Sequence, residues 1–116
     1  MYPRTIPIRD TDFRMVLTDQ LSAEAWERHE PRVHHLGAFL NEFKRRLGPG
    51  GTPLRLVQLA SWDGTRFIIR IQATTGMPIA DVTVDGPSGH VVYMYLHGTA
   101  FKEELRPLVL QRRRGR

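Results

Sequence analysis

The clearest pattern of apolar and polar positions along the chain lies between residues 33 and 47. Apolar side chains recur there at intervals of three and four residues, which is the spacing of an α-helix with one buried face. Three basic residues occupy the last turn, where positive charge complements the helix dipole, and Gly48 follows as a stop signal. The segment predicts one amphipathic helix, whose apolar stripe consists of Val33, Leu36, Leu40, Phe43 and Leu47, widened by Phe39.

A shorter helix is predicted immediately before this one, over residues 23–30. Ser22 is a suitable N-cap, because its hydroxyl can accept a hydrogen bond from a free N–H group of the first turn. Pro31 interrupts this helix and suits the first position of the next one, where its missing N–H has no helical partner. The sequence thus predicts two consecutive helices before residue 48.

From residue 54 onward, the apolar period changes from helical spacing to alternation, which is typical of strands with one buried face. In the best example, Phe67, Ile69 and Ile71 face one way and the residues between them face the other. Short glycine-containing turns separate the segments, so consecutive strands should pair antiparallel. The predicted strands are residues 54–60, 66–73, 79–85 and 90–97.

The two ends of the chain complete the predicted fold. Residues 5–9 and 13–17 are candidate strands, and Pro7 would confine the first of them to a sheet edge or a strand start. Residues 99–110 predict a short helix or a strand, because Pro107 argues against one long helix. We therefore predict an α+β domain, with an amphipathic helix packed on a mostly antiparallel β-meander in a mixed sheet with an N-terminal edge strand.

Charge divides the chain at residue 105. The 116 residues fit a single domain, and the formal net charge is +5. Removing the five arginines of residues 106–116 from the 17 basic residues leaves 12, equal to the 12 acidic residues, so residues 1–105 are formally neutral. We predict a single domain over residues 1–105 and a basic, disordered tail over residues 106–116, which either binds nucleic acid or is a solvated end. The tail arginines are Arg106, Arg112, Arg113, Arg114 and Arg116.

Several kinds of chemistry are excluded by what the sequence lacks. The absence of cysteine excludes disulfides and thiol nucleophiles, and phosphate-loop and nucleophile-elbow motifs are absent as well. His34 and His35 are adjacent and would point about 100° apart on a helix, so we predict no metal site and no cofactor. The sequence has no apolar run long enough to cross a membrane and no recognisable signal peptide. We expect no membrane partner and leave the compartment unknown, with the cytoplasm as the default.

The last predicted strand carries the candidate binding residues His90, Tyr93 and Tyr95. Alternation places both tyrosines on one face with Val91. Exposed tyrosines on a sheet can stack on nucleobases, but they can equally be packed beneath a covering layer. We favour packing for the pair, with one of them available to line a pocket. The opposite face of this strand is predicted to consist of Val92, Met94 and Leu96.

Four segments of the chain follow one another in a characteristic order: a helix over residues 38–47 that ends in a glycine turn, and apolar strands at Arg66–Ala73, Val82–Asp85 and His90–Tyr95. In this order and in their motifs they resemble the N-terminal lobe of the ribosome-inactivating proteins. These are rRNA N-glycosylases that remove one adenine from the large ribosomal RNA. By this resemblance, Gly98–Phe101 would form the last turn and strand of the lobe.

The resemblance extends over roughly residues 5–105 and implies an adenine-binding platform. In the gap-free register the family's first adenine-stacking tyrosine falls on His90, and a shifted strand brings Tyr93 to that position. The family's catalytic Glu and Arg lie three residues apart on a later helix, which this sequence does not reach. We therefore assign His90, Tyr93 and Tyr95 to substrate binding and leave the catalytic residues unknown.

Three functional hypotheses follow. The first is a domain like the adenine-platform half of an rRNA N-glycosylase, truncated or dependent on a second chain, with ribosomal RNA or a complementary C-terminal chain as partner. The second is a non-enzymatic module that binds RNA or a protein through the sheet face and the Arg-rich tail. The third is a small enzyme or ligand-binding domain with a pocket at the last strand.

Overall fold

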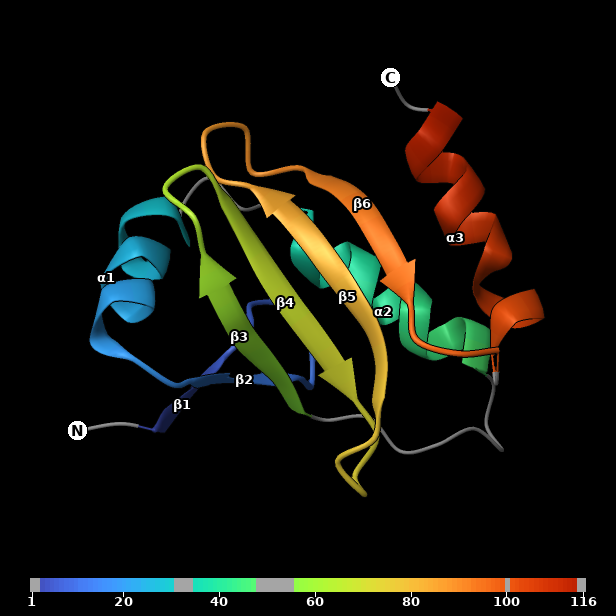
Figure 1. The fold of residues 1–116 in the computed structure, drawn as a ribbon, viewed down its shortest axis with the longest axis horizontal. Coiled ribbons are helices and arrows are strands. Elements are labelled where there is room, and N and C mark those ends of the chain that lie inside the picture. Colours follow the sequence, from blue (N-terminus) through green and yellow to red (C-terminus); the bar gives the residue numbers. More distant parts are fainter. Residues whose placement is uncertain (1–2, 31–34, 48–55, 100, 115–116) are drawn as a thin grey trace.

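The computed structural model, drawn in Figure 1, describes residues 3–30, 35–47, 56–99 and 101–114, and in the last of these segments it describes side chains as far as residue 108. These residues form an α+β fold of three helices and one six-stranded mixed sheet. The elements in chain order are β1 (Arg4–Pro7), β2 (Arg14–Leu17), α1 (Gln20–His29), α2 (Leu36–Leu47), β3 (Leu56–Trp62), β4 (Arg66–Gln72), β5 (Pro78–Asp85), β6 (Val91–Leu96) and α3 (Lys102–Arg114).

The strands are arranged in the sheet in the order in which they occur along the chain, from β1 at one edge to β6 at the other. All neighbouring strands pair antiparallel except β2 and β3, which are parallel. A parallel pair needs a long crossover connection, and the segment that contains α1 and α2 provides it. The predicted mixed sheet with an N-terminal edge strand is therefore confirmed, and Pro7 lies in that edge strand.

One face of the sheet carries the core. In β4 the buried residues Phe67, Ile69 and Ile71 alternate with partly exposed ones, as the sequence predicted. In α2 the apolar stripe is buried at Leu36, Phe39, Leu40 and Phe43. Trp26 of α1 packs edge-on against Phe67, with 5.1 Å between ring centroids. In Figure 1, α2 lies behind the sheet, α1 lies beside the arrowhead of β3 and α3 lies beside β6.

The other face of the sheet is not covered by any of the three described helices, and Figure 1 looks directly onto it. Its side chains are the alternate residues of the strands, which apart from Ile68 are polar or aromatic, and all of them are partly exposed. We call this surface the open face. It consists of Gln58, Ile68, Arg70, Gln72, Asp81, Thr83, Tyr93 and Tyr95.

The start of α1 differs from the prediction. Asp19, not Ser22, is the N-cap, because the Asp19 carboxylate accepts a hydrogen bond of 2.8 Å from the backbone N–H of Ser22. Ser22 is therefore inside the first turn, where it is buried. The second helix is described from Leu36 onward, and the predicted start at Pro31 lies outside the described residues.

The predicted faces of β6 are also wrong in part. The pairing of β5 with β6 shifts between Thr83, which is opposite Tyr93, and Val84, which is opposite Val91. Such a shift is a β-bulge, in which one strand carries an extra residue and the alternation of side chains breaks. Val91 is consequently buried beside the core instead of sharing the face of Tyr93, and Val92 is exposed.

The C-terminal helix α3 is longer than predicted. Pro107 lies inside it, although proline removes one helical hydrogen bond. Buried Leu105 and Leu108 on either side of Pro107 hold the helix against the core and offset that loss. The helix also continues through residues where the sequence predicted a disordered tail from Arg106 onward. Gly98 begins a turn that leads into this helix, and the strand predicted at Gly98–Phe101 does not form in its described residues.

Candidate functional site

A pocket of about 310 Å³ opens where the start of β5, the end of β6 and the start of α3 meet. We call it the β6–α3 pocket. Its polar side chains are those of His97, Thr99 and Lys102, and among the described residues no carboxylate lines it. The remaining side chains are apolar, which is typical of pockets that bind small organic ligands. They are Met77, Pro78, Ile79, Leu96, Phe101 and Leu105.

Backbone contacts fix the walls of this pocket. The N–H of His97 donates a 2.8 Å hydrogen bond to the carbonyl of Ile79, which joins the two strands at the pocket. Gly98 has φ of 74°, a conformation that glycine adopts without strain, and it turns the chain from β6 toward α3. The N–H of Leu105 donates to the carbonyl of Phe101, and Leu105 itself is fully buried. Phe101 is thereby held at the helix start and packs partly against the core.

A chain of polar contacts runs from the open face to His97. Arg70 on β4 donates two hydrogen bonds to the carboxylate of Asp81 on β5, at 2.9 and 3.2 Å. Oδ2 of that carboxylate, which accepts one of these hydrogen bonds, also lies 3.2 Å from Nε2 of His97. Burial is the largest single influence on Asp81 and acts to raise its pKa. The contacts with Arg70 and His97 together outweigh it and hold the pKa of Asp81 below its ordinary value of 3.8.

The lowered pKa of Asp81 implies that its ionised carboxylate stabilises the folded state. A carboxyl group with a lowered folded-state pKa contributes stability above its unfolded pKa, and that stability is lost as the pH falls through the folded value. We expect Asp81→Asn to lower the free energy of unfolding by about 1 kcal/mol near neutral pH. The effect is modest because the ion pair of Arg70 and Asp81 is only partly buried. We also expect the variant to lose less stability than the wild type on acidification below about pH 4. Urea unfolding at neutral and acidic pH measures both effects. Asp12→Asn is the control, because the Asp12 side chain is 86% exposed, and an equal loss in that variant would contradict the assignment.

The two predicted tyrosines lie beside this chain on the open face. Tyr93 and Tyr95 are 49% and 54% exposed, so the interpretation that they are packed beneath a covering layer is wrong. The sequence could not reveal that all three described helices leave their face of the sheet uncovered. The ring of Tyr95 meets the ring of His97 edge-on, with centroids 5.1 Å apart. His97 therefore connects the tyrosines of the open face with the β6–α3 pocket.

His90, the third predicted binding residue, lies elsewhere. It precedes β6, whereas His97 follows that strand, and it does not line the β6–α3 pocket. Its ring stacks on the ring of His35, with centroids 4.5 Å apart and planes within 13° of parallel. One face of the His90 imidazole is thus occupied by another side chain. The structure does not bring His90 together with the pocket-lining side chains.

Helix α3 contains Glu and Arg three residues apart, at Glu103 and Arg106. The two side chains form an ion pair at 3.6 Å, and they are 76% and 55% exposed. The residues of α3 that line the pocket are Lys102 and Leu105. The pair therefore does not lie in the pocket, and we assign it no acid–base role there.

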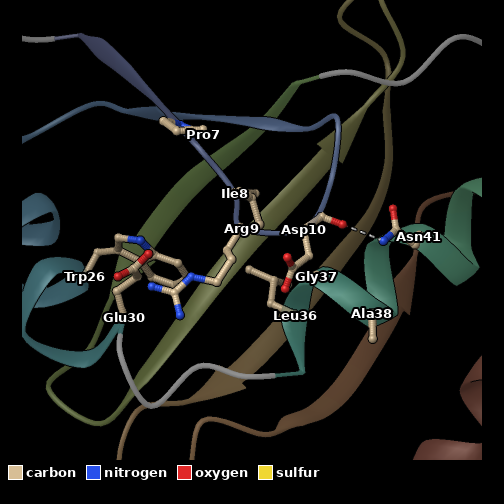
Figure 2. A pocket seen from close by; sticks show the side chains of 10 residues that line it. All are labelled: Pro7, Ile8, Arg9, Asp10, Trp26, Glu30, Leu36, Gly37, Ala38 and Asn41. Atoms are coloured by element: carbon tan, nitrogen blue, oxygen red, sulfur yellow. Dashed lines mark hydrogen bonds between the residues drawn. The ribbon is translucent and has the colours of Figure 1, made fainter.

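A second pocket, of about 420 Å³, lies between the β1–β2 loop, the end of α1 and the start of α2. Figure 2 shows that Arg9 extends toward Trp26 and Glu30 in this pocket, while the carbonyl of Asp10 accepts a hydrogen bond from Asn41 on the opposite side. Asp10 has φ of 66°, a left-handed conformation that is uncommon for a residue other than glycine. This pocket mixes charges of both signs and has a more polar lining than the β6–α3 pocket.

The loop of this second pocket also explains a small residue in α2. A Cβ atom on Gly37 would lie 2.7 Å from the carbonyl oxygen of Arg9, which is closer than real Cβ contacts. Glycine at this position lets the β1–β2 loop and α2 approach each other. The close approach has a structural role in packing and by itself indicates no chemistry.

Among the described residues, His, Asp and Glu form no group of three that could hold a metal ion. Each of the described helices is too short or too polar to span a lipid bilayer.

Phe101 and Met77 are pocket residues that the sequence did not identify. Both follow glycine turns. The sequence predicted a short helix or a strand at Phe101 and a turn between strands at Met77. The pocket forms only because the turn before β5, the end of β6 and α3 meet in space. The only signal in the sequence was the pair of apolar residues near two glycine turns, which is too common to be specific.

The fold and the pocket together define this chain as an α+β domain with a largely apolar pocket beside a tyrosine-bearing sheet face that the described helices leave uncovered. Comparison of the chain with protein-family models, with curated proteins and with solved structures found no match in any of the three.

Proposed function

We propose that this chain is a nucleobase-binding domain similar to the substrate half of a ribosome-inactivating protein. In this proposal the β6–α3 pocket takes one unstacked adenine of an RNA. The observation that carries the proposal is the pocket itself, which combines apolar walls and an aromatic side chain, Phe101, with a few polar groups. A purine base needs this combination, because its faces are apolar and its edges form hydrogen bonds.

The open face supports the same proposal. A base that enters the pocket must leave its stack, so the neighbouring bases of the strand need surfaces on which to lie. Tyr95 and Tyr93 extend from the pocket along β6, and both are about half exposed. Stacking on tyrosine contributes about 1–3 kcal/mol per base and does not depend on sequence. The open face therefore offers a route for single-stranded RNA that ends at the pocket.

The chemistry of base release would need groups that the pocket lacks. Cleavage of a glycosidic bond to adenine requires an acid that protonates the departing base and a negative charge that stabilises the developing cation. No carboxylate lines the β6–α3 pocket in the described residues. We therefore assign base binding to this chain, and we propose that a second chain supplies the acid–base groups for release.

A binding measurement tests this proposal. Fluorescence anisotropy with a labelled, single-stranded oligoadenylate should detect binding, and a duplex of the same length should bind more weakly at the same salt concentration. Attraction by charge alone would favour the duplex, whose phosphate density is higher, and would fall steeply with added salt. Equal binding of both, or stronger binding of the duplex, would contradict the proposal.

An alternative function is a non-enzymatic module that binds RNA through the open face and the arginines of α3 without using the pocket. The exposure of Tyr93 and Tyr95 favours it. Removing residues 107–116 is not a clean test, because Leu108 is buried in the core. Replacing Arg112, Arg113 and Arg114 with glutamine changes the charge and keeps the chain length. If this module is correct, that triple variant and a Tyr93→Ala, Tyr95→Ala double variant both lose RNA binding, whereas Phe101→Ala does not.

A further inference from the structure

His97 is the polar side chain of the β6–α3 pocket whose chemistry the fold determines most closely. A neutral imidazole carries its proton on one ring nitrogen and leaves the other as a hydrogen-bond acceptor. The nitrogen that keeps the proton is set by the neighbour of the ring, and an ionised carboxylate can only accept. The position of Asp81 relative to the ring therefore determines what His97 presents to a ligand.

The neighbour of Nε2 is Asp81. Nε2 lies 3.2 Å from the carboxylate, although the two are not aligned as a regular hydrogen bond. This nitrogen is buried and finds no other hydrogen-bond partner among the described residues. Arg70 donates one hydrogen bond to each oxygen of this carboxylate, which holds Asp81 in its orientation beside the ring. The proton of neutral His97 is thus favoured on Nε2, which leaves Nδ1 as an acceptor.

We propose that His97, whose tautomer is set by Asp81, determines which base the β6–α3 pocket prefers. A base with an N–H donor opposite Nδ1, such as the amino group of adenine, is preferred over a base with a carbonyl oxygen at the same position. The inference rests on the proposed base-binding function and adds a specificity-determining residue to it. In this proposal Nδ1 faces the ligand, so that an N–H donor on the ligand pairs with it, whereas a carbonyl oxygen meets it with a second lone pair. A site built for a hydrogen bond discriminates strongly against an analogue that cannot form it.

Protonation of His97 should reverse this preference, because both ring nitrogens are then donors. The charged or titratable groups around the ring are Asp81 on β5, Arg70 on β4 behind it, Tyr95 on β6 and Lys102 on α3, which lines the same pocket. The pKa of Asp81 is held below its ordinary value, so this carboxylate stays charged on mild acidification. The change of preference is therefore assigned to His97 itself.

The experiment compares adenosine and inosine, which differ in an amino group and a carbonyl oxygen on the same ring. At mildly alkaline pH we expect calorimetry to show that adenosine binds about tenfold more tightly than inosine. The ratio of the two affinities should fall on acidification. His97→Phe is the matched variant, because it keeps a planar ring for packing and removes both nitrogens. It should bind the two nucleosides with similar affinity. Nitrogen-15 NMR of the imidazole should show the proton on Nε2 in the wild type and a weaker preference in Asp81→Asn.

The possible outcomes distinguish a failure of the specificity inference from a failure of the base-binding function. Binding of both nucleosides with equal affinity, or a proton on Nδ1, overturns the specificity inference and leaves the base-binding function standing. Discrimination that persists in His97→Phe also overturns it, because the selecting group would then be another residue. Failure of the wild type to bind either nucleoside overturns the proposed function and the specificity inference together.

Discussion

Phe67→Ala is expected to lower the free energy of unfolding by about 3–5 kcal/mol, the usual cost of removing a buried phenylalanine. Phe67 is fully buried at the centre of an aromatic cluster. Its ring lies 4.3 Å from that of Trp62, 5.1 Å from that of Trp26 and 5.6 Å from that of His29, measured between centroids. The substitution leaves a cavity where α1 packs on the sheet and removes the contacts that hold this helix. A loss of that size is a large part of the 5–15 kcal/mol by which domains are usually stable.

Urea unfolding of the wild type and of Phe67→Ala measures this difference in the free energy of unfolding. Ile68→Ala is the control, because Ile68 is the next residue of the same strand and is partly exposed on the open face. We expect it to cost about 1 kcal/mol or less. Equal losses for the two variants would contradict the assignment of the core to one face of the sheet.

Phe101→Ala is expected to weaken the binding of adenosine by about tenfold or more, in line with the loss of one aromatic surface that stacks on a base. Phe101 is an aromatic residue that lines the β6–α3 pocket, at the turn that begins α3. It also packs partly against the core, so the alanine variant combines two effects. Phe101→Leu separates them, because leucine restores most of the apolar packing and lacks an aromatic face.

If stacking carries the binding, Phe101→Leu is as stable as the wild type and still binds adenosine weakly, and Phe101→Tyr binds it well. Calorimetry gives the affinity for adenosine and urea unfolding gives the stability, both measured on the same preparation of each variant. Full affinity in the leucine variant would show that the pocket needs only apolar volume at this position. That result would remove the aromatic contribution from the proposed function.

Much of the fold could be predicted from the sequence because the relevant patterns are local. Alternation in β4 and the helical stripe of α2 depend only on the spacing of apolar residues, and both are confirmed. The bulge in β6 could not be predicted, because Val91 and Val92 are both apolar and either one satisfies the pattern. The start of α1 was misplaced for a similar reason, because Asp19 and Ser22 are both good capping residues.

The candidate site was harder to predict because it is formed by contacts between distant segments. The polar contacts of Arg70, Asp81 and His97 follow from the register of three strands, which no single strand reveals. The exposure of Tyr93 and Tyr95 depends on the face of the sheet that the helices cover. The resemblance to ribosome-inactivating proteins predicted binding residues in β6 and just before it. The pocket lies at the end of that strand opposite to His90.

The most direct test of the base-binding proposal is an NMR titration of the isotopically labelled chain with adenosine. We expect saturable shift changes in residues that line the β6–α3 pocket, above all in Met77, Ile79, His97, Phe101 and Leu105. Amides around Arg9, Trp26 and Asn41, which line the second pocket, should stay unchanged and serve as the internal control. Shift changes confined to the second pocket, or no saturable change anywhere, would contradict the proposal that the β6–α3 pocket binds a nucleobase.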